Sequence, residues 1–115
     1  IVPVPLHKAK QAQRGYNQSL LIAGGMSDMM QIPADDGVLE RVRLTESQTR
    51  KSREERLKNM EAAFRISDVA KVRGKHLLLC DDVLTTGATL EACALALMRD
   101  ESIKISIATI GIALS

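Results

Sequence analysis

The sequence predicts an α/β fold of three layers, in which helices flank a mostly parallel sheet. Strand and helix signals alternate along the 115 residues, which is the order that builds parallel sheets. The apolar run from Leu77 to Cys80 is short and bounded by polar residues, as expected of a buried parallel strand. Asp81 and Asp82 follow it directly, and a small, hydroxyl-rich loop comes next. Ligands of such folds bind at the carboxyl ends of the strands, so this loop is the first candidate site.

The first half of the chain has one helix signal between two strand signals. Residues 1–6 predict a strand interrupted by prolines, and residues 17–31 predict a helix that Gly24 and Gly25 weaken. The apolar residues on or near one face of this helix are Leu21, Ile22, Met26, Met29 and Met30. We then expect a turn over 33–37, a strand over 38–43, and a polar segment with one or two helical stretches over 45–63.

The second half predicts a strand, a helix and a second strand. The strands are expected over 76–80 and 103–110, with the helix over 90–98 between them. If the sheet is parallel, the loops that follow Pro5 and Cys80 lie on the same rim.

Length and composition limit the class of protein. A chain of 115 residues forms one small domain, and no apolar run approaches the ~20 residues of a membrane helix. No signal peptide is visible. Cys80 and Cys93 lack a C-x-x-C spacing, so we interpret them as buried apolar residues in a cytoplasmic protein. With one Tyr and one Phe, the chain has few platforms for stacking on bases, and Tyr16 is the exposed candidate.

Positive charge is concentrated in the first two thirds of the chain. Fourteen of the 16 Lys and Arg residues lie within residues 1–75. One cluster comprises His7, Lys8, Lys10 and Arg14, and a second extends from Arg41 to Lys58. Both suit a ligand with several phosphates and equally a nucleic-acid backbone. Residues 52–58 also fit a solvated helix, because Ser52 and Glu55 form a capping box and the charges alternate in sign.

The loop after the acidic pair predicts a phosphate site. Residues 85–89 offer backbone amides, three hydroxyls and one Gly just before a helix, and amides at a helix start bind anions. Carboxylates beside a phosphate repel it unless they serve another part of the ligand. Asp81 and Asp82 can accept charge-assisted hydrogen bonds from adjacent sugar hydroxyls, so the pattern indicates a ribose 5-phosphate cradle. The chain has neither the Walker loop nor the G-x-G-x-x-G motif.

This pattern resembles the signature of type I phosphoribosyltransferases, an acidic pair followed by Thr-Thr-Gly-x-Thr. In that family the signature holds the ribose 5-phosphate of phosphoribosyl pyrophosphate (PRPP). Other motifs, in order through almost the whole chain, resemble the ComF family of competence-associated phosphoribosyltransferase-like proteins. These motifs are Val2-Pro3-Val4-Pro5-Leu6, Arg14-Gly15-Tyr16-Asn17-Gln18, Thr45-x-x-Gln48, Arg53-x-x-Arg56-x-x-Asn59 and Ala62-Ala63-Phe64.

The resemblance implies a fold, a reaction and a set of site residues. We expect residues 1–115 to form a type I phosphoribosyltransferase-like domain without the zinc ribbon and helix that usually precede the Val-Pro-Val-Pro strand of ComF proteins. The implied reaction transfers ribose 5-phosphate from PRPP and releases pyrophosphate, with Mg²⁺ held mainly by the ligand. The implied assignments are Asp81 and Asp82 to the ribose hydroxyls; Thr85, Thr86, Gly87, Ala88 and Thr89 to the 5-phosphate; a loop with His7, Lys8 and Arg14 to pyrophosphate; and Arg53 or Arg56 to the catalytic loop that closes over PRPP.

The composition of the stretch that follows the first strand keeps another function open. The stretch from Leu6 to Arg14 is less basic than the arginine-rich version expected in the family, because it contains Ala9, Gln11, Ala12 and Gln13. A ComF-like domain can instead be a non-catalytic accessory in DNA uptake or repair, docking to a helicase or to DNA through its basic segments. We also expect that an exposed sheet edge allows a homodimer.

Overall fold

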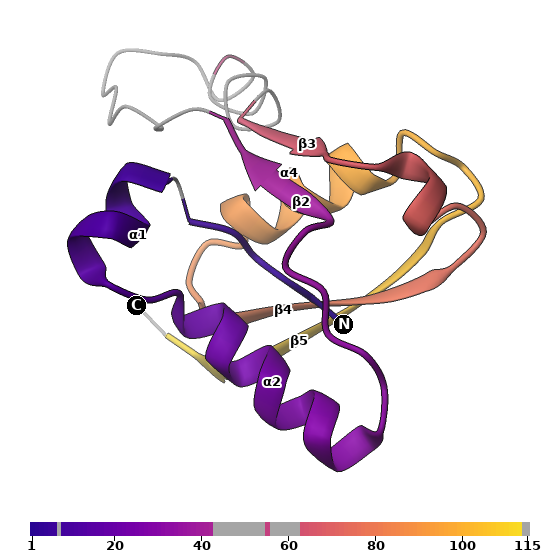
Figure 1. Ribbon diagram of the computed structural model, residues 1–115. Coiled ribbons are helices and arrows are strands. Elements are labelled where there is room, and N and C mark those ends of the chain that lie inside the picture. Colours follow the sequence, from indigo (N-terminus) through magenta and orange to yellow (C-terminus); the bar gives the residue numbers. More distant parts are fainter. Residues whose placement is uncertain (7, 43–54, 56–62, 114–115) are drawn as a thin grey trace.

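The computed structural model describes residues 1–6, 8–42, 55 and 63–113. Its main sheet has three parallel strands in the order β1-β4-β5, formed by Val2–Pro3, His76–Leu84 and Lys104–Ile112 (Figure 1). Val2 pairs with Leu79, and β4 pairs with β5 along almost its whole length. β1 is short because prolines supply no amide hydrogen to a sheet. The α/β class with a parallel sheet flanked by helices is therefore confirmed.

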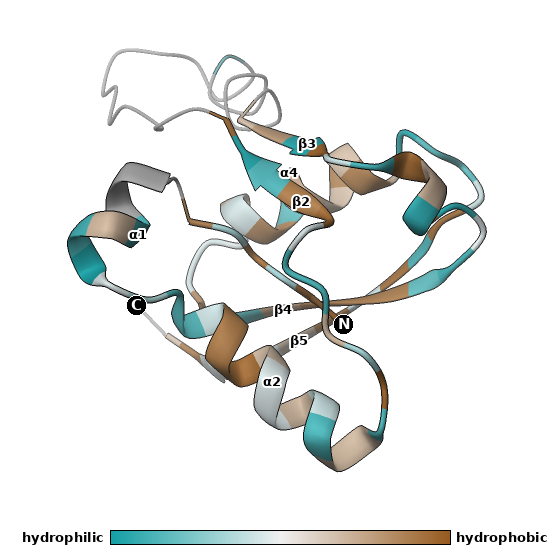
Figure 2. Cartoon of the chain, viewed as in Figure 1, coloured by the Kyte–Doolittle hydropathy of each residue, from teal (hydrophilic) through white to brown (hydrophobic). Residues whose placement is uncertain are grey.

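Helices cover both faces of this sheet, so the molecule has two apolar cores. Helix α2 (Gln18–Met30) packs Ala23 against Ile1 and Cys80 on one face. Helix α4 (Ala88–Leu97) covers the other face, where its buried residues form the larger core with Leu77 and Leu79 of β4 and with Phe64. Figure 1 shows these helices on opposite sides of β4 and β5, and Figure 2 shows apolar residues along the strands and on α2. Apolar residues on both faces explain the uninterrupted apolar run from residue 77 to residue 80.

The strand expected over 38–43 is shorter and lies outside the main sheet. β2 (Leu39–Arg41) pairs antiparallel with β3 (Phe64–Ile66), and the two form a separate small sheet. Leu39 and Phe64 are buried against α4, while Arg65 pairs with Glu40 across the strands on the exposed side. Sequence alternation predicts a strand here but not the sheet to which it belongs.

The basic stretch after β1 is a helix rather than the expected loop. α1 comprises Lys8–Arg14, and its Lys, Ala, Gln and Arg residues all have high helix propensity. Gly15 ends it with a positive φ of 85° and donates a hydrogen bond to the Gln11 carbonyl, which a residue without a Cβ does at little cost. Helix α2 then begins one residue later than predicted, at Gln18, with Asn17 as its N-cap.

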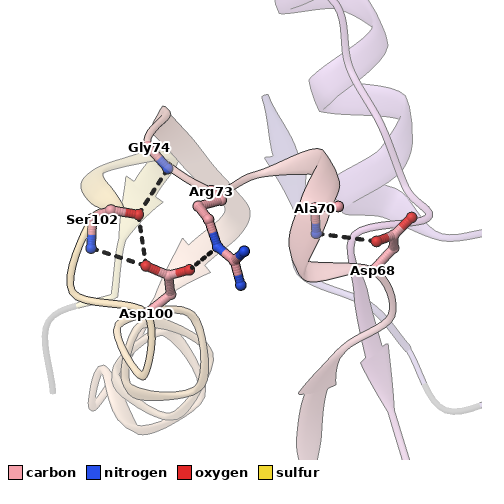
Figure 3. A network of polar contacts seen from close by, with 6 residues as sticks. All are labelled: Asp68, Ala70, Arg73, Gly74, Asp100 and Ser102. Carbon is pink, nitrogen blue, oxygen red and sulfur yellow. Dashed lines mark hydrogen bonds and ion pairs between the residues drawn. The ribbon is translucent and has the colours of Figure 1, made fainter.

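A polar network closes the edge of the sheet where β4 and β5 begin (Figure 3). The Arg73 guanidinium contacts the Asp100 carboxylate at 3.1 Å. The Ser102 hydroxyl donates to Asp100 and accepts from the Gly74 amide at 2.8 Å. These contacts join the turn before β4 to the turn before β5, and thereby fix where both strands start. In the described part of the chain, no helix has both the length and the apolar character needed to cross a membrane.

Candidate functional site

The acidic pair lies within β4 rather than after it. The strand continues four residues beyond Cys80 because β5 pairs with it as far as Leu84, opposite Ile112. Asp81 stands opposite Thr109, and both aspartates lie near the carboxyl end of the strand. Neighbouring residues of a strand point to opposite faces. The two side chains therefore leave the backbone on opposite faces, yet their carboxylates lie close enough to interact, since Asp82 helps to raise the pKa of Asp81.

Asp81 is the more constrained of the two. Its Oδ1 accepts a hydrogen bond from the Ser19 hydroxyl at 2.8 Å and another from the Asp82 amide at 2.9 Å. Burial, and to a smaller extent the neighbouring Asp82 carboxylate, raises the pKa of this carboxyl above its usual value, and the bonds from the Ser19 hydroxyl and the Asp82 amide act in the opposite direction. Asp81 is thus a partly desolvated acceptor whose orientation is fixed through one oxygen.

Asp82 is held in a similar way but by the backbone alone. Its Oδ1 accepts the Val83 amide hydrogen at 2.7 Å. The side chain is partly exposed, so its other oxygen is accessible to a ligand. The two aspartates therefore offer one oriented carboxylate oxygen each at this end of the sheet.

The predicted phosphate loop is a sharp turn into the start of α4. Thr85 and Thr86 are exposed, and Gly87 has a φ of 84° and forms the N-cap without a side-chain hydrogen bond. The Thr86 hydroxyl accepts from the Ala88 amide at 3.3 Å. The first backbone bond of the helix runs from the Glu91 amide to the Gly87 carbonyl. The amides of Thr89 and Leu90 precede that bond and are available to an anion.

Two site residues lie at the start of α2, Asn17 as its N-cap and Ser19 in its first turn, and sequence reasoning missed the role of each. The Asn17 side chain accepts from the Ser19 amide and donates to the Val4 carbonyl at 3.2 Å. The Ser19 hydroxyl reaches Asp81. The cap pattern of an Asn before a helix is visible in the sequence. Contacts across 62 residues to Asp81 are not, because they depend on how α2 crosses the sheet.

The other predicted site residues are placed only in part. Lys8 and Arg14 lie on α1, with Arg14 exposed in its last turn. Helix α1 follows β1, and β1 is the neighbour of β4 in the sheet. Both loops therefore leave the same edge, as predicted. His7, Arg53 and Arg56 lie outside the described residues.

A comparison with protein families shows the family of this domain. Residues 17–114 match the family model described as "Phosphoribosyl transferase domain". The chain belongs to this family. The match includes the acidic pair, the turn after it and helix α4, which are the parts that the sequence pattern singled out.

Curated relatives of this phosphoribosyltransferase domain confirm the resemblance to the ComF family. The chain is 36% identical over 100 residues to the DNA utilization protein YhgH of Escherichia coli K12, and the aligned region covers 87% of this chain and 43% of the relative. It is 38% identical over 92 residues to the competence protein F of Haemophilus influenzae, and the aligned region covers 78% of this chain and 40% of the relative. It is 34% identical over 100 residues to the competence protein ComFC of Bacillus subtilis, and the aligned region covers 86% of this chain and 38% of the relative.

The chain thus spans about two fifths of the length of these curated relatives. No solved structure gives a significant match to it.

The two cysteines lie in the apolar cores of the domain, Cys93 beside other residues of helix α4 and Cys80 beside Ile1 and Ala23. Both thiols are buried and unpaired, and burial raises the pKa of Cys93 to about 12, so it behaves as a packing residue. Within the described ranges, no three side chains of His, Cys, Asp or Glu are grouped to hold a metal ion. Mg²⁺ in proteins is commonly bound by one or two carboxylates together with substrate phosphates rather than by an all-protein cage, and Asp81 and Asp82 are the two carboxylates near the carboxyl end of β4.

Proposed function

We propose that this domain binds PRPP at the carboxyl end of β4 and transfers its ribose 5-phosphate to an acceptor nucleophile. The observation that supports this most directly is the pairing of two kinds of group at one end of a strand. Asp81 and Asp82 offer oriented acceptors for sugar hydroxyls, and the first turn of α4 offers the amides of Thr89 and Leu90 as donors for a phosphate. A ribose 5-phosphate carries partners for both kinds of group.

The proposed step is a displacement at the anomeric carbon. The bond from that carbon to pyrophosphate breaks, pyrophosphate leaves with the electron pair, and the acceptor forms the new bond. Positive charge develops on the ribose, and the carboxylates of Asp81 and Asp82 stabilise it while holding the hydroxyls. Lys8 and Arg14 are proposed to contact the leaving pyrophosphate, and Arg53 or Arg56 to close over it. The chemistry that Mg²⁺ would supply, if bound together with PRPP, is neutralisation of part of the leaving group's charge.

A calorimetric titration of PRPP tests the proposal. We expect saturable binding that requires Mg²⁺ and that is lost in an Asp81→Asn/Asp82→Asn double variant. Asp36→Asn is the matched control, because Asp36 lies exposed in the turn between α2 and β2. A folded wild-type protein that shows no binding at millimolar PRPP would overturn the proposal. Equal affinity in the double variant and the control would remove the role of the acidic pair.

The names of the relatives favour a second candidate function. YhgH is named a DNA utilization protein, and the others are named competence proteins. We propose as the alternative that the domain is an accessory module in DNA handling that docks to DNA or to a helicase. Basic residues are abundant in residues 1–75, which supports contact with a phosphate backbone.

Salt dependence and competition separate the two functions. DNA binding through a basic surface weakens steeply as salt is added, and if it uses residues away from β4, PRPP does not displace the DNA. Displacement of labelled DNA by PRPP would instead indicate one shared polyanion site. No binding of DNA at low salt would overturn docking to DNA.

A further inference from the structure

Two polar residues, Asn17 and Ser19, are buried in the described part of the chain. They are 7% and 4% exposed, although polar side chains are rarely buried without a specific partner. Asn17 is explained by the helix, since its side chain caps α2 through the Ser19 amide. The hydroxyl of Ser19 is not needed for that cap, because the cap uses only the backbone of Ser19.

The partner of that hydroxyl is Asp81. The Ser19 Oγ donates to Asp81 Oδ1 at 2.8 Å, and the Asp82 amide donates to the same oxygen at 2.9 Å. A carboxylate with two donors on one oxygen cannot rotate freely about its last bond. Its Oδ1 is thereby used by the protein, and its Oδ2 keeps its acceptor capacity.

We infer that Ser19 is a positioning residue, which orients the Asp81 carboxylate so that its Oδ2 accepts a hydroxyl of the bound ribose. This inference rests on the proposed function and names a residue that holds the sugar-binding group. Ser19 does not touch the substrate. It acts through Asp81, from a different layer of the fold.

The same turn also connects the acid to β1. The Asn17 amide group donates to the Val4 carbonyl, just before the chain continues into α1. The Cys80 thiol contacts the Ser19 carbonyl at 3.6 Å. The turn at residues 17–19 therefore joins the end of β1 to β4 beside the acidic pair, and Ser19 is the member that reaches the carboxylate.

The test compares Ser19→Ala with Ser27→Ala by calorimetric titration of ribose 5-phosphate and of pyrophosphate. Ser27 lies on the same helix and is half-buried, and its side chain makes no hydrogen bond within the described part of the chain. We expect Ser19→Ala to weaken the binding of ribose 5-phosphate by roughly three- to tenfold and to leave the affinity for pyrophosphate unchanged. We expect Ser27→Ala to change neither, and Ser19→Thr, which keeps the hydroxyl, to recover most of the affinity.

A double-variant cycle separates positioning from general damage to the fold. In an Asp81→Ala background, Ser19→Ala should cause no further loss of ribose 5-phosphate affinity, because there is no carboxylate left to orient. Wild-type affinity in Ser19→Ala, or an equal further loss in the Asp81→Ala background, would overturn the inference while the proposed function stands. Failure of the wild-type protein to bind ribose 5-phosphate and PRPP would overturn both.

Discussion

Gly87→Ala is expected to damage the domain in two separable ways. Gly87 has a φ of 84°, and an L-residue in this left-handed region costs about 1–2 kcal/mol. A Cβ at this position would lie 3.5 Å from Leu84 Cδ1, which is an ordinary contact, so crowding adds little. The free energy of unfolding should therefore fall by about 1–2 kcal/mol. For a domain of this size, each 1 kcal/mol lowers Tm by roughly 4–8 °C.

Gly74→Ala is the matched control for this variant. Gly74 has a φ of 75°, and a methyl group added to it would meet no neighbouring atom within 4 Å. It lies at the opposite edge of the sheet, in the turn before β4 (Figure 3). Both variants should lose similar stability in thermal melts. Only Gly87→Ala should also lose affinity for PRPP, because it changes the start of α4. Equal losses of PRPP affinity in the two variants, measured well below both Tm values, would refute the assignment of the phosphate to this turn.

Three further predictions concern titrating groups. Because burial raises the pKa of Asp81, this group stabilises the fold below its unfolded pKa, and that stabilisation is lost as pH rises through the folded pKa. Asp81→Asn should therefore raise Tm at pH 7, and the gain in Tm should shrink toward pH 3. A lower Tm for Asp81→Asn at pH 7 would contradict this prediction. Hydrogen bonds from Ser102 and, to a smaller extent, from Arg73 lower the pKa of Asp100. The contribution of Asp100 to folding stability is therefore present above its unfolded pKa and is lost as pH falls through the folded pKa. Ser102→Ala should reduce the drop in Tm on acidification. With a pKa of about 12, Cys93 should resist iodoacetamide at pH 8 until denaturant is added, and labelling at the rate of a free thiol would show that it is accessible.

The local pattern predicted the strands of the main sheet well, because their sequence signal is strong. The strand expected at 103–110 is observed as Lys104–Ile112, and the helix expected at 17–31 as Gln18–Met30. The extension of β4 through Asp81 and Asp82 was missed, since two acids look like the end of a strand. Pairing with β5 supplies backbone partners that override this local preference.

The arrangement of the candidate site could be predicted where its residues are contiguous in the sequence and not where they meet across the fold. The acidic pair and the turn after it lie within nine residues, and so they read as one motif. The expectation of a loop was wrong over residues 8–14, because it followed the family resemblance rather than the helix propensity of Lys, Ala, Gln and Arg. The place of Ser19 depends on α2 crossing β4, which no local pattern contains.

The topology explains why this edge of the sheet is suited to a ligand and the other is not. β1 and β4 are adjacent and parallel, so the chain leaves both strands at the same edge, where the acids and the uncapped start of α4 remain available to a partner. At the opposite edge, Asp100 is already bonded to Arg73 and Ser102, and Ser102 to Gly74 (Figure 3). Polar groups that satisfy one another hold a turn in place, whereas acceptors and amides left partly unsatisfied favour a ligand. We therefore expect Arg73→Ala to lower the stability of the domain and to leave its PRPP affinity unchanged. We expect Asp82→Asn to lower the PRPP affinity and to leave the stability unchanged.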